Sequence, residues 1–234
     1  MDTTWRAGVG QAGATPIKVL FVKRISWWLC LIGCGLIGAC VEPIVSMRPG
    51  TRTFSADDYE EIYERWTRSA NEFDFGRLKT VLHATATLES REFRWAYVVR
   101  YSEDFSLPPD ARSSMLAATL ADADRHHRFF LTIGDGRPRE LDLTDEGGAF
   151  RVLLVDDRGR QTRPTEVERV RIATKAERTY FSSISPFRQA FRLVFPVTGE
   201  DGYPTLPPEA LSATLRITGP SGHVDLTWEF ADQR

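Results

Sequence analysis

The pattern of apolar and polar positions divides the chain into a helical first part and a strand-rich second part. Residues 55–73 place large apolar side chains at the spacing of one helix face, which predicts an amphipathic helix. This face consists of Tyr59, Ile62, Tyr63, Trp66, Ala70 and Phe73. Ser55 and Asp58 have the spacing of a capping box at the helix start. Aromatic surface of this size must be covered, and we expect the following domain to cover it rather than a partner or ligand.

Residues 82–88 alternate apolar and polar side chains, which predicts a half-buried strand. Residues 90–104 fit two patterns, because their aromatic side chains recur both at the spacing of a strand and at the spacing of a helix face. We predict a helix there for two reasons. Ser90 is a suitable N-cap, and a strand would leave Ala96 and Val98 facing solvent.

A further helix is predicted after Pro108 and Pro109, which suit a first helical turn. Its apolar face consists of Ala111, Met115, Leu116, Leu120 and Ala123. The best candidate metal ligands of the chain follow at its end, namely Asp122, Asp124, His126 and His127. Helical spacing would divide these four side chains into two pairs on different faces, so the sequence predicts a solvated helix end and no metal site.

The second half of the chain contains short apolar runs separated by turn residues, which is typical of strands. We predict strands at 129–133, 150–155, 166–172, 178–184, 190–195, 212–218 and 223–230. The last two flank a glycine- and proline-containing turn and form a terminal hairpin. The expected fold class is therefore α+β, mainly β: an antiparallel immunoglobulin-like sandwich with an N-terminal group of about three helices.

These patterns give a linear domain organisation for the chain of 234 residues. An extension without periodicity comes first, and a misassigned start codon would explain it. The extension covers residues 1–22. It is followed by a signal peptide (23–40), a proline- and glycine-containing tether (41–53), a mainly helical region with one strand (54–126) and the β-sandwich (127–234).

The signal peptide is predicted from two cations, Lys23 and Arg24, that precede an apolar run with small residues at its far end. The run ends Ile37-Gly38-Ala39-Cys40, which resembles the lipobox of bacterial lipoproteins. That resemblance implies acylation of Cys40 and cleavage just before it. Cys34 ends a second, poorer lipobox, and an uncleaved membrane helix is the other alternative, because the run has about the minimum length for a span.

Charge and cysteine content restrict the functions open to the exported part. The whole chain has a net charge of −2, but four of its 30 basic side chains lie in residues 1–40 against one acid, so the remainder is at −5. Such a chain offers no basic patch for nucleic acid. Since no cysteine follows Cys40, the exported part has no internal disulfide, thiol nucleophile or thiolate metal site.

Three later motifs occur in the same order as in uncharacterised predicted lipoproteins of myxobacterial type, which the exported part resembles. They are Ser90-x-x-Phe93-x-x-x-Tyr97-x-x-x-Tyr101, Leu154-Val155-Asp156-Asp157-x-Gly159, and Phe195-Pro196. The resemblance spans most of the exported chain. It implies a lipid anchor and lends no biochemical function.

The sequence contains none of the usual signatures of hydrolases, nucleotide-binding proteins or zinc proteases, so we predict no catalytic residues and no cofactor. The predicted function is a lipid-anchored, non-enzymatic interaction or scaffold module of the bacterial cell envelope, on the outer membrane. Its expected partners are the membrane, through the lipid anchor, and an envelope protein. The alternative is a carrier or sensor of an apolar or carbohydrate ligand. The candidate ligand or partner surface consists of Trp66, Trp95, Tyr97 and Tyr101.

Overall fold

The computed structural model describes residues 44–47, 53–74, 79–135, 142–144, 148, 150–219 and 222–231. The predicted extension 1–22 and the predicted signal peptide with Cys34 and Cys40 lie outside these residues. The described residues belong to one compact unit, Glu42–Arg234. Its secondary structure is mainly β with helices, as the sequence predicts.

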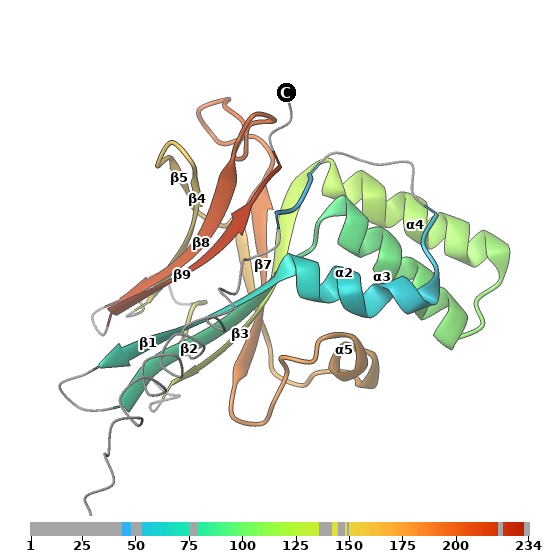
Figure 1. Ribbon diagram of the computed structural model, residues 1–234, viewed down its shortest axis with the longest axis horizontal. Helices are drawn as coiled ribbons and strands as arrows, with labels where there is room; N and C mark the ends of the chain where they lie inside the picture. The colour runs from blue at the N-terminus through green and yellow to red at the C-terminus, as the bar shows by residue number, and fades with distance from the viewer. Residues whose placement is uncertain are drawn as a thin grey trace, which may run out of the picture. The chain divides into compact units, whose positions relative to one another are not determined.

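Two antiparallel sheets make up the β part (Figure 1). The first has the strand order β1-β2-β3-β7-β6 and the second β5-β4-β8-β9. The strands of the first sheet are β1 (Thr67–Asp74), β2 (Lys79–Leu88), β3 (His126–Asp135), β7 (Gln189–Pro196) and β6 (Glu166–Val170). Those of the second are β5 (Gln161–Thr162), β4 (Arg151–Asp156), β8 (Ser212–Gly219) and β9 (Gly222–Glu229). The predicted terminal hairpin is confirmed as β8 and β9, which pair from Ser212 with Glu229 to Gly219 with Gly222.

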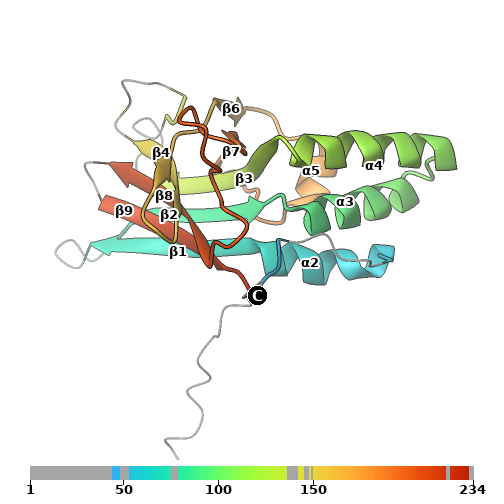
Figure 2. The ribbon, with the colours of Figure 1, turned by 90° about the horizontal axis from the view of Figure 1, so that it is seen from above.

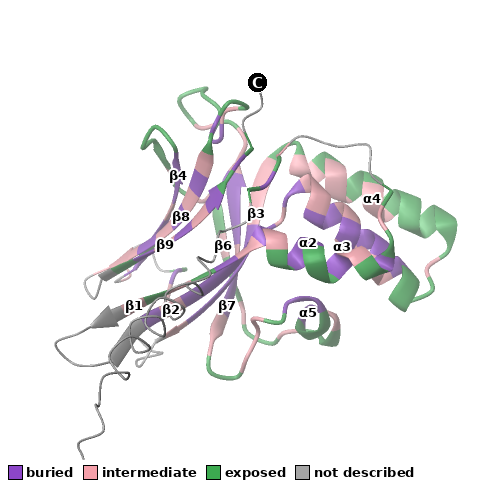
Figure 3. Cartoon of the chain, viewed as in Figure 1, coloured by how far each residue is buried: buried purple, intermediate pink, exposed green. Residues whose placement is uncertain are grey.

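The inner faces of both sheets share one hydrophobic core, because alternate residues of each strand point inward. Trp228 of β9 lies over Phe129 of β3, with ring centroids 5.3 Å apart, and both side chains have no exposed surface. Figure 3 shows the buried residues concentrated along the facing strands and on α3. Strands β1 and β2 belong to the same sheet as β3, β6 and β7, so the predicted border between residues 126 and 127 does not separate two folding units.

The first helix is shorter than the sequence pattern predicts. A single 3₁₀ turn, η1 (Ala56–Asp58), leads into α2 (Tyr59–Trp66), and the chain continues as β1 from Thr67. The prediction of a helix to residue 73 is therefore wrong. Thr67 and the next alternate positions pair with β2, where the Thr67 and Thr87 hydroxyl oxygens are 2.8 Å apart and those of Ser69 and Thr85 2.9 Å. This strand pairing outweighs the continuation of the helical stripe.

The two helices between β2 and β3 are confirmed as α3 (Arg91–Asp104) and α4 (Pro109–Ala123). The Ser90 hydroxyl accepts a hydrogen bond from the Phe93 amide at 3.1 Å, so the predicted N-cap is formed. Helix α3 packs between α2 and α4 and carries buried residues, whereas α4 has no buried residue and forms the outer layer (Figures 2 and 3).

The predicted strand 178–184 is wrong, because this segment begins within α5 (Lys175–Tyr180) and continues as a loop. Thr174 and Glu177 form a capping box, in which the Thr174 hydroxyl accepts from the Glu177 amide at 3.1 Å and the Glu177 carboxylate accepts from the Thr174 amide at 2.6 Å. The Tyr180 hydroxyl donates to Asp104 at the end of α3, at 2.7 Å. These contacts hold α5 against the helical layer.

The segment 41–53, predicted as a tether, is described at residues 44–47 and 53. Val45 is buried and pairs with the end of β9: its amide donates to the Glu229 carbonyl at 2.9 Å, and its carbonyl accepts from the Ala231 amide at 2.8 Å. At Val45 the chain is therefore packed into the domain rather than extended away from it. Within the described residues no helix has the length and hydropathy needed to span a membrane.

Candidate ligand-binding site

The outer face of the five-stranded sheet carries the charged residues of the site beside the apolar side chains of Phe130 and Val194. Glu89 directly follows β2, and its amide donates to the Arg128 carbonyl at 2.9 Å, which places the two residues opposite each other. On the next strand pair, Arg128 lies opposite Val194 and Phe130 opposite Arg192. Arg128 and Arg192 are thus diagonal neighbours on the face that carries Glu89.

A cavity of about 380 Å³ lies over this row of charged residues, between the sheet and the helices α3, α4 and α5. Aromatic side chains form one part of its wall and ionisable side chains the other. The lining residues are Glu89, Phe93, Arg94, Tyr97, Ala118, Thr119, Asp122, Arg128, Glu177, Phe181 and Arg192. The volume is within the range of small-molecule sites, about 300–1,000 Å³.

Arg94 of α3 braces the inner wall of the cavity. Its guanidinium donates to the carbonyls of Glu89 at 2.7 Å, Thr119 at 3.1 Å and His126 at 3.3 Å, and the side chain is 4% exposed. These carbonyls belong to the end of β2, to α4 and to the start of β3. One buried cation therefore fixes the three elements that surround the cavity.

Asp122, near the end of α4, is the acid on which two of the arginines converge. Its carboxylate accepts from Arg128 Nε at 2.6 Å, from Arg94 Nη1 at 2.6 Å and from His126 Nδ1 at 2.9 Å. The hydrogen bonds from Arg128 and then Arg94 hold the pKa of Asp122 well below its usual range, although burial opposes them. Asp122 is therefore ionised, and Asp122, Arg94 and Arg128 together have a net charge of +1.

Arg192 closes the opposite wall. It pairs with Glu177, the buried capping residue of α5, and lies 3.6 Å from the Glu168 carboxylate of β6. Arg192 Nε and Arg128 Nη1 have no hydrogen-bond partner in the described part of the chain. Both arginines are partly exposed at the cavity, so each has a donor available for a ligand.

Glu89 differs from the other acids of the cavity. Its backbone is paired, but its carboxyl group has no hydrogen bond and no ion pair within 4 Å among the residues that the structure describes. Burial raises the pKa of Glu89, and the nearby charges of Arg94, Arg128 and Arg192 oppose this effect only in part. This carboxyl group therefore faces the cavity without a direct protein partner and accepts a proton more readily than an exposed glutamate.

Aromatic rings form the rest of the wall. Phe181, after α5, stacks on Phe130 of the sheet with ring centroids 4.1 Å apart, and it lies 5.9 Å from Phe93 of α3. Burial, followed by the Tyr101 hydroxyl, raises the pKa of Tyr97 to about 12, so its hydroxyl keeps its proton at neutral pH. No described residue bonds to that hydroxyl, which is a further available donor at the cavity.

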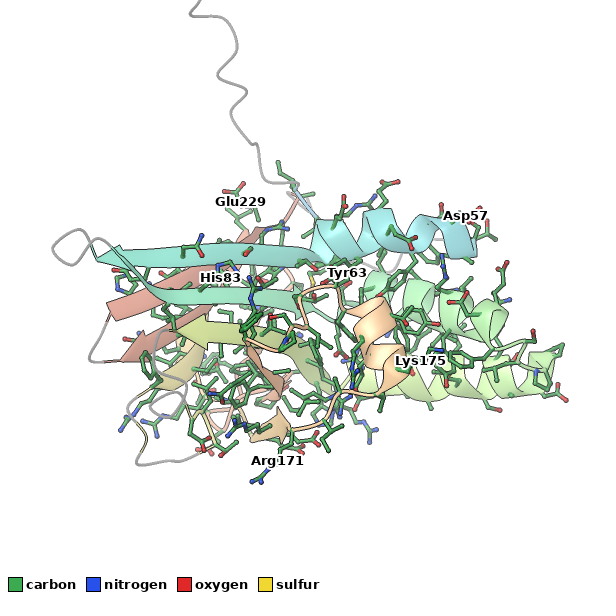
Figure 4. All side chains as sticks on the ribbon, turned by 90° about the horizontal axis from the view of Figure 1, so that it is seen from below. Asp57, Tyr63, His83, Arg171, Lys175 and Glu229 are labelled. Carbon is green, nitrogen blue, oxygen red and sulfur yellow. The ribbon has the colours of Figure 1, made fainter. Side chains whose placement is uncertain are left out.

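The four residues of the predicted surface are distributed over three environments. Trp66 is fully buried at the end of α2, and Trp95 packs on Phe54 with centroids 5.7 Å apart. Tyr97 and Tyr101 stack on each other at 5.9 Å, and of these four residues only Tyr97 lines the cavity. The aromatic cluster continues through Tyr63, which Figure 4 shows beneath α2 on the side of α5.

The candidate metal ligands do not form a cluster in the structure. His126 and His127 lie in β3 rather than on a helix, Asp122 is occupied by arginines, and Asp124 pairs with Arg91. His127 is largely buried, and no described residue bonds to its Nε2. Among the described residues no group of three or more His, Cys, Asp and Glu side chains could hold a metal ion.

The sequence analysis missed most of the residues that line the cavity. Glu89, Arg128 and Arg192 come from segments up to 103 positions apart, and only the strand register brings them together. One local signal was available, since Thr174 and Glu177 have the spacing of a capping box and predict α5.

No protein-family model matches the chain, and no curated protein matches it with significance. The fold and the cavity are therefore the observations from which function can be argued.

Proposed function

We propose that this chain is a lipid-anchored protein of the bacterial cell envelope whose exported domain holds a small ligand in the cavity between the sheet and the helices α3, α4 and α5. It acts as a carrier or sensor and not as an enzyme. The anchor part rests on the resemblance of residues 37–40 to a lipobox, with Cys40 as the acylated residue and the outer membrane as its location. Its partners are the membrane and the ligand, and nucleic acid is not among them.

The cavity is the single observation that carries the ligand-binding proposal. Its volume of about 380 Å³ suits a small molecule, and its wall combines an aromatic part with hydrogen-bond donors that the protein leaves available. A chain that served only as a scaffold would need neither feature. No lining residue forms a nucleophile–base pair with another lining residue, which is why binding is proposed rather than catalysis.

The anchor would hold the domain close to the bilayer. Five chain steps separate Cys40 from Val45, and each step spans at most about 3.6 Å, so the covalent reach is about 18 Å. Since Val45 is paired with β9, a lipid on Cys40 would be joined to the domain by a short connection rather than by a long tether.

An interaction module is the second candidate, and one observation favours it. Ile172 and Phe187 are 84% and 88% exposed, the highest values among the large apolar side chains in the described residues. They follow β6 and precede β7, which pair at the edge of the sheet, where Val170 lies opposite Ala190. Exposed apolar side chains that form a contiguous patch are a feature of protein-binding surfaces. The strand connections of an immunoglobulin-like sandwich are also retained as a proposal, supported by two antiparallel sheets with a common core.

The ligand-binding proposal is tested by releasing bound small molecules. The chain is produced in a bacterial envelope, purified without denaturation and examined by native mass spectrometry, and any released compound is identified. Ala118→Trp, which would place a large ring in the cavity from the exposed face of α4, should abolish the bound species. Ala117→Trp changes a neighbouring exposed alanine that does not line the cavity, and it should leave the bound species unchanged. Equal occupancy of both variants would refute the site.

A further inference from the structure

The cavity has more available donors than available acceptors, and this imbalance restricts the ligand. Asp122 and Glu177 are occupied by arginines. The Tyr97 hydroxyl, Arg128 Nη1 and Arg192 Nε have no partner among the described residues. Among the described lining residues, the Glu89 carboxyl group is the only ionisable acceptor without a direct partner, and the Thr119 hydroxyl, which can donate or accept, has no partner either. A ligand that satisfies these groups must therefore bring acceptor atoms.

The charges of the wall favour one negative charge on the ligand. Arg94 and Arg128 share the single charge of Asp122, and Arg192 is balanced by Glu177, so these five lining groups leave one positive charge. Glu89 cancels that charge only while it is ionised. Glu168, which also lies 3.6 Å from Arg192, is 55% exposed and does not line the cavity. A cation would be repelled by the three guanidinium groups. A phosphate monoester would bring up to two negative charges, and the wall has one positive charge to balance them.

We propose that the cavity binds a small organic acid, whose carboxylate pairs with Arg128 and Arg192 and whose apolar body lies against Phe93 and Phe181. Glu89 is uncharged in this complex and donates its proton to the ligand carboxylate. The Tyr97 hydroxyl is a further donor to the same ligand. This inference rests on the proposed ligand-binding function and specifies the chemical class of the ligand.

Binding is then coupled to the protonation of Glu89. The groups that face Glu89 are Arg94 and Tyr97 on α3, Asp122 on α4, Arg128 on β3, Arg192 on β7 and Glu177 on α5. Arg128 and Tyr97, whose pKa values are raised, keep their protons across the neutral range, and Asp122, whose pKa is lowered, stays ionised. Glu89 is therefore the lining group whose charge changes when the ligand enters. Where free Glu89 is ionised, the complex takes up one proton.

The test uses four probes that share a phenyl ring and differ in their head group: 3-phenylpropionate, 3-phenylpropanol, 3-phenylpropylamine and 2-phenylethyl phosphate. The full exported chain, purified from the producing cells and held in lipid nanodiscs, is titrated by calorimetry between pH 5.5 and 8, with empty nanodiscs as the blank. The carboxylate should bind at least tenfold more tightly than the other three probes. Its affinity should fall, by up to tenfold per pH unit, over the range in which free Glu89 ionises.

Glu89→Gln keeps the shape of the side chain and removes the titration. The variant should bind 3-phenylpropionate with an affinity that does not change with pH, and its binding should take up no proton in buffers of different ionisation enthalpy. Glutamine is nearly isosteric with glutamate, and Glu89 forms no ion pair within 4 Å in the described part of the chain. The substitution therefore changes the titration without removing an ion pair from the cavity wall. Arg128→Lys keeps the positive charge but loses the planar guanidinium group that can bind a carboxylate through two hydrogen bonds. It should weaken the binding of 3-phenylpropionate by about tenfold.

The outcomes separate the ligand class from the site. If the alcohol, the amine or the phosphate binds more tightly than the carboxylate, and Ala118→Trp abolishes that binding, the ligand is not an organic acid. The proposal that the cavity binds a ligand would still stand. An affinity for the carboxylate that rises with pH, or a pH dependence that persists in Glu89→Gln, would overturn the role of Glu89. If no probe binds and no compound is released from the purified chain, both the ligand class and the proposed function are wrong.

Discussion

Replacing Trp66 by alanine tests whether the aromatic stripe of α2 is core or contact surface. The Trp66 side chain has no exposed surface, and its indole Nε1 donates to the Glu92 carboxylate at 2.8 Å. Its carbonyl accepts from Trp228 Nε1 at 2.9 Å, so the residue joins the helical layer to the second sheet. The substitution removes a large ring from the point where α2 becomes β1, and it leaves a cavity there.

The expected cost follows from this burial. Truncation of a buried tryptophan to alanine costs about 3–5 kcal/mol, because both the transfer free energy and the packing of the surrounding atoms are lost. For a domain of this size, each kcal/mol lowers the melting temperature by about 2–4 °C, so the expected decrease is about 6–20 °C. Trp95→Ala is the matched control: Trp95 is partly exposed, and its loss should cost less than half as much.

Thermal unfolding followed by circular dichroism, together with urea unfolding, measures both variants. The chain should begin at residue 41 so that Val45 keeps its place beside β9. A decrease of less than about 2 °C for Trp66→Ala would refute core packing. The same small decrease combined with loss of a bound ligand would assign Trp66 to a binding surface instead.

Three further predictions concern the anchor and the charged groups. Cys40→Ala should abolish acyl-label incorporation and precursor cleavage while Cys34→Ala changes neither, and the reverse result would move the anchor to Cys34. Burial lowers the pKa of His127 to about 4, so the unfolded chain binds a proton between pH 6.5 and 4 that the native chain does not; His127→Phe should therefore reduce the loss of urea stability over this range, and an unchanged slope would contradict it. Asp122→Asn leaves the buried Arg94 without its charged partner and should cost about 3–5 kcal/mol at pH 7. Since the pKa of Asp122 is below its usual value, this stabilisation is complete above about pH 4 and is lost as the pH falls further, so the two proteins should converge in acid; a constant difference would contradict the assignment.

Local chemistry determined the elements that the sequence predicted correctly. The side chain of Ser90 caps α3 through the Phe93 amide, and that bond forms between residues three positions apart. The hairpin of β8 and β9 needs only a short turn and alternating apolar residues that face the core. Both signals depend on residues that are close together in the sequence, so they can be recognised from the sequence alone.

Pairing between distant segments decided the rest. The helical stripe of α2 continues in the sequence to residue 73, but the chain leaves the helix at Thr67 because the residues from there onward pair with β2, beginning with Thr67 opposite Thr87. The cavity depends on the same effect. Glu89, Arg128 and Arg192 become neighbours only through the registers of β2 with β3 and of β3 with β7, and only the tertiary structure fixes a register between strands so far apart in the chain.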